Sequence, residues 1–177
     1  MEEPVKRKQN RLSGYDYSRN GVYFLTICAK DREPIFGQLQ LQQQSVGGGA
    51  LDAPQAEGQV VLSSNGCAIQ NWISDCDKKY GDLRVLKYVI MPNHIHLLLY
   101  LENGPSRAPA PTPGRCNERI PRLVSGMKRM TNKVCGCDLW QRGYHDHIVR
   151  NDADYLRIWQ YIETNPAKWA EDKYYIR

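Results

Sequence analysis

The stretch that decides the fold is Met91-Pro92-Asn93-His94-Ile95-His96-Leu97-Leu98-Leu99-Tyr100. In it, a Pro-Asn turn precedes an apolar run that begins with two histidines on either side of an isoleucine. Because residues i and i+2 of a β-strand project from the same face, His94 and His96 point the same way and Ile95 points into a core. The two imidazoles are therefore placed to hold one metal ion, although an ordinary half-buried strand shows the same alternation.

The residues before this turn complete a hairpin. Residues 84–90 (RVLKYVI) are rich in aliphatic and β-branched side chains, which favours a strand that pairs across the turn. The hairpin presents His94 and His96 near one strand end. A histidine pair alone does not separate a nuclease from a zinc hydrolase or a cupin-like site, so a second element is needed.

The remaining chain alternates strand-like and helix-like patterns. Strands are predicted at 21–29 and 38–41, a short strand at 139–144, and helices at about 60–80, 118–134 and 152–164. Residues 167–175 fit a turn or a further helix. Hairpins covered by helices indicate an α+β fold, a two-layer sandwich with a largely antiparallel sheet.

The length of 177 residues predicts a single domain spanning 1–177. A basic N-terminal arm is expected at 1–20, and flexible insertions at 42–58, which is rich in Gln and Gly, and at 102–117, which is rich in Pro. No apolar run reaches the roughly 20 residues of a membrane span, and the N-terminus lacks the apolar stretch of a secretory signal. We therefore expect a cytoplasmic protein with reduced cysteines and no membrane partner.

The formal net charge of +5 is unevenly distributed. Residues 1–32 carry seven Lys and Arg against four Asp and Glu, and residues 107–150 carry nine against three. Two basic segments on a near-neutral body are typical of a protein that binds phosphates. A merely solvated surface has the same composition, so charge alone does not decide between these interpretations.

A second chemical element lies on the predicted C-terminal helix, in the sequence Tyr161-Ile162-Glu163-Thr164-Asn165-Pro166. Tyr161 and Asn165 are four residues apart, so they share one helix face. A tyrosine hydroxyl can act as a nucleophile, and an asparagine amide oxygen is a hard ligand for Mg²⁺ or Mn²⁺. Two readings compete with this one: Tyr155 is a rival tyrosine on the same helix, and Asn165 could instead cap a helix that starts at Pro166.

Zinc-type residues occur in a different part of the chain, at Cys135, Cys137, His145 and His147. Small zinc modules use wider gaps between paired ligands than the one-residue gaps found here. A structural zinc site is therefore not expected from these residues, and the role of the two histidines stays open.

With these motifs in order along nearly the whole chain, the sequence resembles the IS200-like transposases, a family that includes the REP-associated tyrosine transposases and belongs to the single-tyrosine HUH endonucleases. The matching stretches are GYDY at 14–17, YFLTIC at 23–28, YVIMPNHIH at 88–96, LWQRGY at 139–144, DHIVRN at 146–151, and Tyr161-Ile162 with Asn165-Pro166. The histidine pair and the tyrosine motif are weak signals singly and specific together.

The resemblance implies a ferredoxin- or RRM-like HUH fold with the catalytic tyrosine on a C-terminal helix. His94, His96 and Asn165 would bind Mg²⁺ or Mn²⁺, and Tyr161 would attack a phosphate of single-stranded DNA to form a 5′-phosphotyrosine. A free 3′-OH could later reverse this link and transfer the strand. Two alternatives to this activity are a DNA-hairpin-binding protein without catalysis and a metal-dependent nuclease without a covalent step.

The resemblance also implies a partner, single-stranded DNA that contains a hairpin, with which the protein would associate in the nucleoid. The family includes homodimers and monomers, and the sequence does not choose between them. Phosphate contacts are expected from basic residues of the arm and of the basic helix: Lys6, Arg7, Lys8, Arg11, Arg119, Arg122, Lys128, Arg129 and Lys133.

Overall fold

The structure is a computed structural model that describes residues 19–42, 57–102 and 119–175. The arm at 1–18 and most of the two predicted insertions lie outside the described residues. Within the described part of the chain, no helix is long and apolar enough to cross a membrane.

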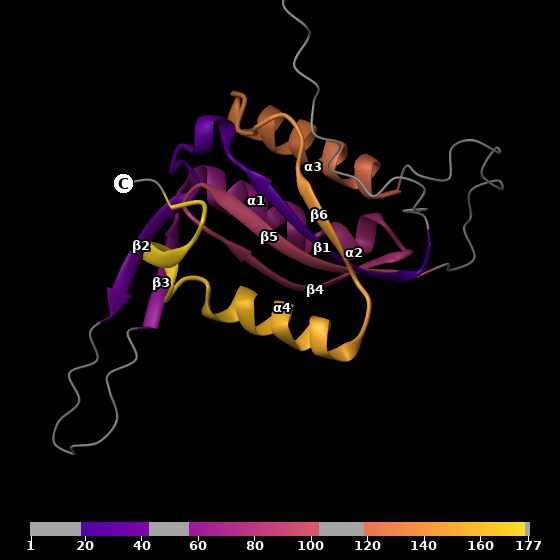
Figure 1. The fold of residues 1–177 in the computed structure, drawn as a ribbon. Helices are drawn as coiled ribbons and strands as arrows, with labels where there is room; N and C mark the ends of the chain where they lie inside the picture. Colours follow the sequence, from indigo (N-terminus) through magenta and orange to yellow (C-terminus); the bar gives the residue numbers. More distant parts are fainter. Residues whose placement is uncertain (1–18, 43–56, 103–118, 176–177) are drawn as a thin grey trace, which may run out of the picture.

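A four-stranded sheet forms the centre of the fold (Figure 1). Its strand order is β4 (Leu83–Ile90), β5 (His94–Leu101), β1 (Gly21–Cys28) and β6 (His145–Val149), and all neighbours are antiparallel. The register sets Cys28 opposite His94 and Thr26 opposite His96. The predicted hairpin at the Pro-Asn turn and the predominantly antiparallel sheet are confirmed.

The two faces of β5 are covered by different helices. Ile95, Leu97 and Leu99 belong to the main core, which includes residues of α1 (Ser64–Ser74) and α3 (Arg119–Cys135). The alternate residue Leu98 packs instead with Ile158 and Ile162 of α4 (Asp152–Thr164). His94 and His96 share the parity of Leu98 and therefore lie on the α4 face.

Helices thus cover both faces of the sheet, and the predicted two layers are in fact three (Figure 1). The reason is that the α4 face of the sheet is also apolar: Val22, Phe24 and Leu98 lie on it. Leaving this surface in water would cost about 25 cal/mol for each Å² of apolar area, so a further helix covers it.

A separate hairpin of β2 (Gly37–Gln42) and β3 (Glu57–Leu62) lies against the end of α4. A Cβ atom at Gly58 would stand 2.5 Å from the carbonyl oxygen of Pro166, so this close approach requires glycine. Leu39 and Val60 pack against the cluster that contains Trp169 and Tyr174. The hairpin therefore supports the segment that follows α4, which includes the short 3-10 helix η2 (Trp169–Glu171).

Two sequence predictions of secondary structure are wrong in detail. The helix expected over 60–80 begins only at Ser64, because Val60 and Val61 pair in β3, and it continues as the short α2 (Cys76–Lys79) after Ser74. The short strand expected at 139–144 is displaced to 145–149, and within the predicted range only Trp140 forms an isolated bridge, to Ala29.

Candidate active site

Two histidines of β5 form the centre of the site. The Nε2 atoms of His94 and His96 lie 3.0 Å apart, and both side chains are almost completely buried, at 0% and 1% exposed. Burial lowers the pKa of both imidazoles below the ordinary value, because the charged form loses its solvation. Both rings are therefore neutral near pH 7, the form in which a histidine nitrogen binds a metal.

The other ring nitrogen of each histidine has a polar partner. Nδ1 of His94 lies 2.9 Å from Oδ1 of Asn93, and Nδ1 of His96 lies 2.9 Å from Oγ1 of Thr26. Such outer partners set the ring orientation of metal-binding histidines. The two Nε2 atoms are therefore directed toward a common point between the rings.

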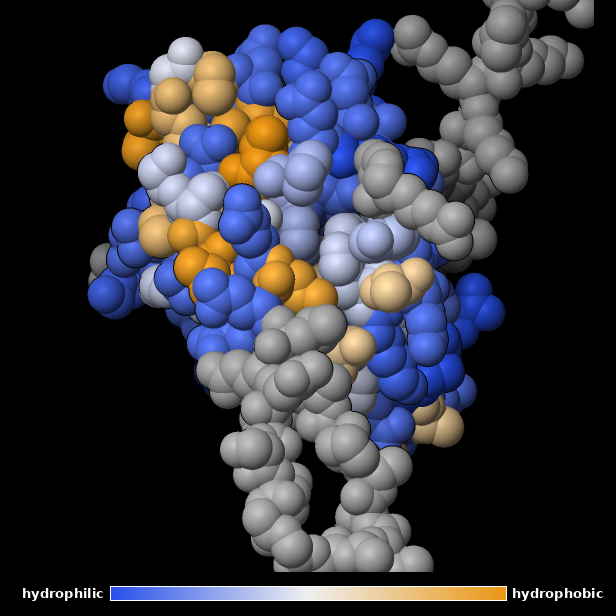
Figure 2. All heavy atoms as spheres, turned by 90° about the vertical axis from the view of Figure 1, so that its left-hand side faces the viewer, coloured by the Kyte–Doolittle hydropathy of each residue, from blue (hydrophilic) through white to orange (hydrophobic). Residues whose placement is uncertain are grey.

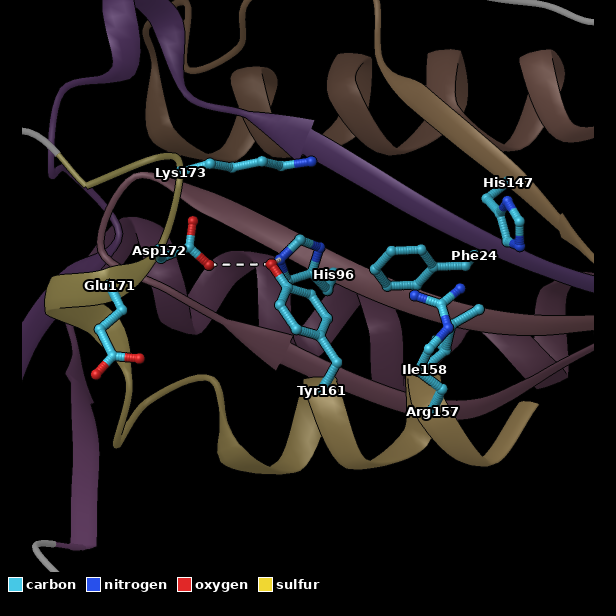
Figure 3. A pocket seen from close by; sticks show the side chains of 9 residues that line it. All are labelled: Phe24, His96, His147, Arg157, Ile158, Tyr161, Glu171, Asp172 and Lys173. Carbon is cyan, nitrogen blue, oxygen red and sulfur yellow. Dashed lines mark hydrogen bonds between the residues drawn. The ribbon is translucent and has the colours of Figure 1, made fainter. Parts of the chain in front are cut away.

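Tyr161 of α4 brings its hydroxyl to the histidine pair. Its oxygen lies 3.2 Å from Nε2 of His96, and it donates a hydrogen bond of 3.0 Å to Oδ2 of Asp172. Ile158, Tyr161, Ile162 and Asn165 recur at helical spacing, so burying the two isoleucines turns the tyrosine and the asparagine toward the sheet. The Tyr161 ring therefore lies beside His96, between the sheet and Asp172 (Figure 3).

The hydroxyl of Tyr161 faces an open pocket of about 450 Å³. Phe24, His147 and Arg157 line the pocket on the side away from Asp172, and Lys173 stands above Asp172 in the view of Figure 3. Burial, reinforced by the negative charge of Asp172, raises the pKa of Tyr161 above its ordinary value. Tyr161 is therefore a protonated phenol in the metal-free protein. Its rival Tyr155 is directed elsewhere and packs against Trp159, with ring centroids 5.8 Å apart.

Asn165 ends α4 as its C-cap residue and does not start a new helix at Pro166. Its Nδ2 donates a hydrogen bond of 2.7 Å to Oδ2 of Asp172. Its Oδ1 is buried and has no hydrogen-bond partner among the described residues. A buried oxygen that lacks a hydrogen bond destabilises the fold, so Oδ1 of Asn165 is available to bind a cation.

Asp172 is the site residue that sequence reasoning missed. Within the described ranges, the one group of histidine, cysteine and acidic residues able to hold a metal is His94, His96 and Asp172, whose ligand atoms lie within 4.8 Å of one another. The backbone N–H of Tyr174 donates to Oδ1 of Asp172 at 2.7 Å and holds the carboxylate in place. The only signal in the sequence was an acidic residue shortly after the Asn-Pro helix end.

The basic helix α3 lies on the face of the sheet opposite to the histidine pair. Arg119 forms an ion pair with Asp82, and Nζ of Lys128 donates to the carbonyls of Gln141 and Gly143 at 2.7 and 2.6 Å. The other three predicted phosphate contacts of this helix are exposed: Arg122, Arg129 and Lys133. The predicted contacts of the arm, at Lys6, Arg7, Lys8 and Arg11, lie outside the described residues.

The zinc-type residues do not converge. Cys135 and Cys137 are free thiols at the end of α3, and His145 and His147 lie on β6. Nε2 of His147 lies 2.7 Å from Oδ2 of Asp154 on α4. His147 thus joins β6 to α4 at the rim of the pocket.

Comparison with known proteins gives the family to which this fold and this group of side chains belong. The chain is 32% identical to a Haemophilus influenzae protein named as a REP-associated tyrosine transposase, over 89% of this chain and 77% of that protein. It therefore belongs to the IS200-like / REP-associated tyrosine transposase family, as its motifs indicated.

Two further proteins are similar to this chain, one in sequence along nearly its whole length and one in fold. An uncharacterized Haemophilus influenzae protein is 28% identical over 96% of this chain and 93% of its own length. A REP-associated tyrosine transposase solved with a REP hairpin shares the fold, with a TM-score of 0.58 and 17% identity over 94% of this chain and 77% of that one. No family model matches the sequence.

Proposed function

We propose that this protein nicks and rejoins hairpin-containing single-stranded DNA through a covalent bond between Tyr161 and a 5′-phosphate. The observation that carries the proposal is the position of the Tyr161 hydroxyl, 3.2 Å from Nε2 of His96 and facing the pocket. Because the Tyr161 hydroxyl reaches His96 of its own chain, one subunit is sufficient to form the site. The relative solved with a REP hairpin supports a hairpin as the substrate.

The residues at the site fit a divalent cation. His94 and His96 offer neutral imidazole nitrogens, Asn165 offers its unpartnered Oδ1, and Asp172 offers a carboxylate. Nitrogen ligands mixed with carboxylate and amide oxygens suit Mn²⁺, and the oxygens also suit Mg²⁺. When bound, the cation offsets negative charge on the phosphate and on its leaving oxygen.

The side chains of this chain handle the proton and the nucleophile. The Tyr161 oxygen forms a bond to phosphorus while its proton passes to Oδ2 of Asp172, its hydrogen-bond acceptor at 3.0 Å. The bond between phosphorus and the 3′ oxygen breaks, and that oxygen takes up a proton from the solvent of the open pocket and leaves as a free 3′-OH. The phosphodiester energy is kept in the phosphotyrosine, so attack by a 3′-OH rejoins the strand without ATP.

The proposal is tested with hairpin single-stranded DNA labelled at either end, incubated with the protein and Mg²⁺ or Mn²⁺ and then denatured. We expect a protein–DNA adduct that retains the label on the 3′ side of the nick, and a released fragment with a 3′-OH. Binding without cleavage would identify a hairpin-binding protein. Cleavage without an adduct would identify a nuclease that uses water, and either result would overturn the proposal.

The two oxygen ligands can be separated by substitution. Asp172→Asn keeps the shape of the side chain but removes its charge, and Asn165→Ala removes the unpartnered oxygen. If both bind the cation, each variant should weaken Mn²⁺ binding by about tenfold or more in calorimetric titrations. Glu171→Gln, a neighbouring exposed acid at the pocket rim, should bind Mn²⁺ as the unsubstituted protein does. Unchanged affinity in either test variant would remove that residue from the ligand set.

Exposed cations of α3 are proposed to contact DNA phosphates away from the nick, because this helix lies behind the sheet. Replacing Arg122, Arg129 and Lys133 together by alanine should reduce the slope of log affinity against log salt by about 2 to 3. Fluorescence anisotropy of a labelled hairpin at several salt concentrations measures the slope. Lys128→Ala is the matched control, since its ammonium already bonds two backbone carbonyls. An unchanged slope in the triple variant would show that α3 does not face the DNA.

A further inference from the structure

Asn93 lies directly before the histidine pair and is buried, at 1% exposed. Its Nδ2 donates two hydrogen bonds to backbone carbonyls, to Arg32 at 3.1 Å and to Tyr174 at 2.8 Å. A carbonyl oxygen can only accept, so these two contacts fix which end of the amide is nitrogen. Oδ1 must then face Nδ1 of His94, at 2.9 Å.

We propose that Asn93 is a positioning residue that fixes the tautomer of His94 and so prepares its Nε2 for a metal. An amide oxygen accepts and cannot donate, so the neutral ring of His94 must carry its proton on Nδ1. Nε2 is left with a lone pair directed at His96. The role assigned to this lone pair rests on the proposed function, whereas the tautomer itself follows from the hydrogen bonds alone.

The partner of His96 has a different character. A threonine hydroxyl both donates and accepts, so Thr26 permits either tautomer of His96. In the metal-free protein, His96 can donate from Nε2 to the lone pair of His94 at 3.0 Å, while Thr26 donates to its Nδ1. On cation binding, His96 can move its proton to Nδ1 and donate to Thr26. The pair therefore combines His94, whose tautomer is fixed by Asn93, with His96, which can adopt either tautomer.

The same amide connects the histidine to the segment that carries Asp172. Its bond to the Tyr174 carbonyl holds the chain two residues beyond Asp172, and the Tyr174 ring lies 4.6 Å from the ring of His94. One buried side chain thus aligns ligands from β5 and from the region after η2. Removal of a residue that hydrogen-bonds to a metal ligand typically weakens metal binding by about 10- to 100-fold.

The first test needs no substitution. Long-range ¹H–¹⁵N correlation spectra of the metal-free, full-length protein report which nitrogen of each assigned histidine carries the proton. We expect His94 to be protonated on Nδ1 alone. A His94 protonated on Nε2, or a mixture of the two tautomers, would overturn the proposal whatever the protein does to DNA.

The second test compares two substitutions. Asn93→Ala removes the acceptor and should give mixed tautomers at His94 and weaken Mn²⁺ binding about 10- to 100-fold. Asn93→Asp keeps an acceptor for Nδ1 but loses both donors, so it should retain the tautomer and bind Mn²⁺ more tightly than the alanine variant. Asn132→Ala, which removes a hydrogen-bonded asparagine on α3, should match the unsubstituted protein. If both Asn93 variants lose affinity equally with the tautomer unchanged, Asn93 is only a tether and the proposal fails.

Discussion

Tyr161→Phe is expected to abolish the covalent DNA adduct and to reduce strand cleavage by more than about a thousandfold, the scale of effect seen when a catalytic nucleophile is removed. The substitution deletes one oxygen and keeps the ring, which packs edge-on to Phe24 with centroids 6.1 Å apart. Fold and metal binding should therefore survive. Denaturing electrophoresis of reactions with labelled hairpin DNA measures both the adduct and the cleaved strand.

The matched control for this experiment is Tyr155→Phe on the same helix. Tyr155 packs against Trp159 and does not line the pocket of Tyr161. Its phenylalanine variant should form the adduct at the normal rate. Cleavage that persists in Tyr161→Phe, or an adduct lost equally in both variants, would show that Tyr161 is not the nucleophile.

The half of the site on β5 could be predicted from sequence because it depends on local geometry. Strand alternation places His94 and His96 on one face, and helical spacing places Tyr161 and Asn165 on another, whatever the rest of the chain does. That the two faces meet was implied by the family resemblance. The structure adds the physical reason, since Leu98 on β5 packs against Ile158 and Ile162 on α4.

Asp172 could not be predicted because its position depends on contacts between distant segments. The chain turns after Asn165, and Trp169 and Tyr174 are held in a cluster with Met91 and residues of the β2–β3 hairpin. Residues 167–175 show no periodic pattern from which these contacts could be predicted. The surface at this end of the molecule is mostly hydrophilic, with separate hydrophobic patches (Figure 2). No continuous apolar stretch marks the place where residues 167–175 pack.

Strand β6 was misplaced for a related reason. Its sequence, HDHIV, holds three polar residues in five, and only Ile148 is buried. It pairs with β1 at the edge of the sheet. This backbone pairing makes it a strand, although its side-chain pattern does not predict one. The predicted helix extends back to about Val60 because Val61 would share a helical face with Ile69 and Trp72. Pairing with β2 decides the conformation of Val60 and Val61 instead.

His96→Ala should remove both metal binding and adduct formation, unlike Tyr161→Phe, which should remove only the adduct. His96 lies between the other histidine and the tyrosine: its Nε2 is 3.0 Å from that of His94 and 3.2 Å from the Tyr161 hydroxyl. Loss of an outer partner alone costs about 10- to 100-fold in metal affinity, so loss of a direct ligand should cost more than about 100-fold. Calorimetric titration with Mn²⁺ and the adduct assay measure the two effects on the same preparation.

His145→Ala is the matched control, because it deletes an exposed histidine of β6 that joins no candidate metal-binding group among residues 19–42, 57–102 and 119–175. It should titrate with Mn²⁺ as the unsubstituted protein does. Thermal unfolding establishes that His96→Ala is folded, and His94→Ala provides an independent loss of one imidazole if it is not. Mn²⁺ affinity that is unchanged in both folded ligand variants would contradict the metal site. In that case Tyr161 would have to act without a cation, with only the donors around its pocket to offset the charge of the phosphate.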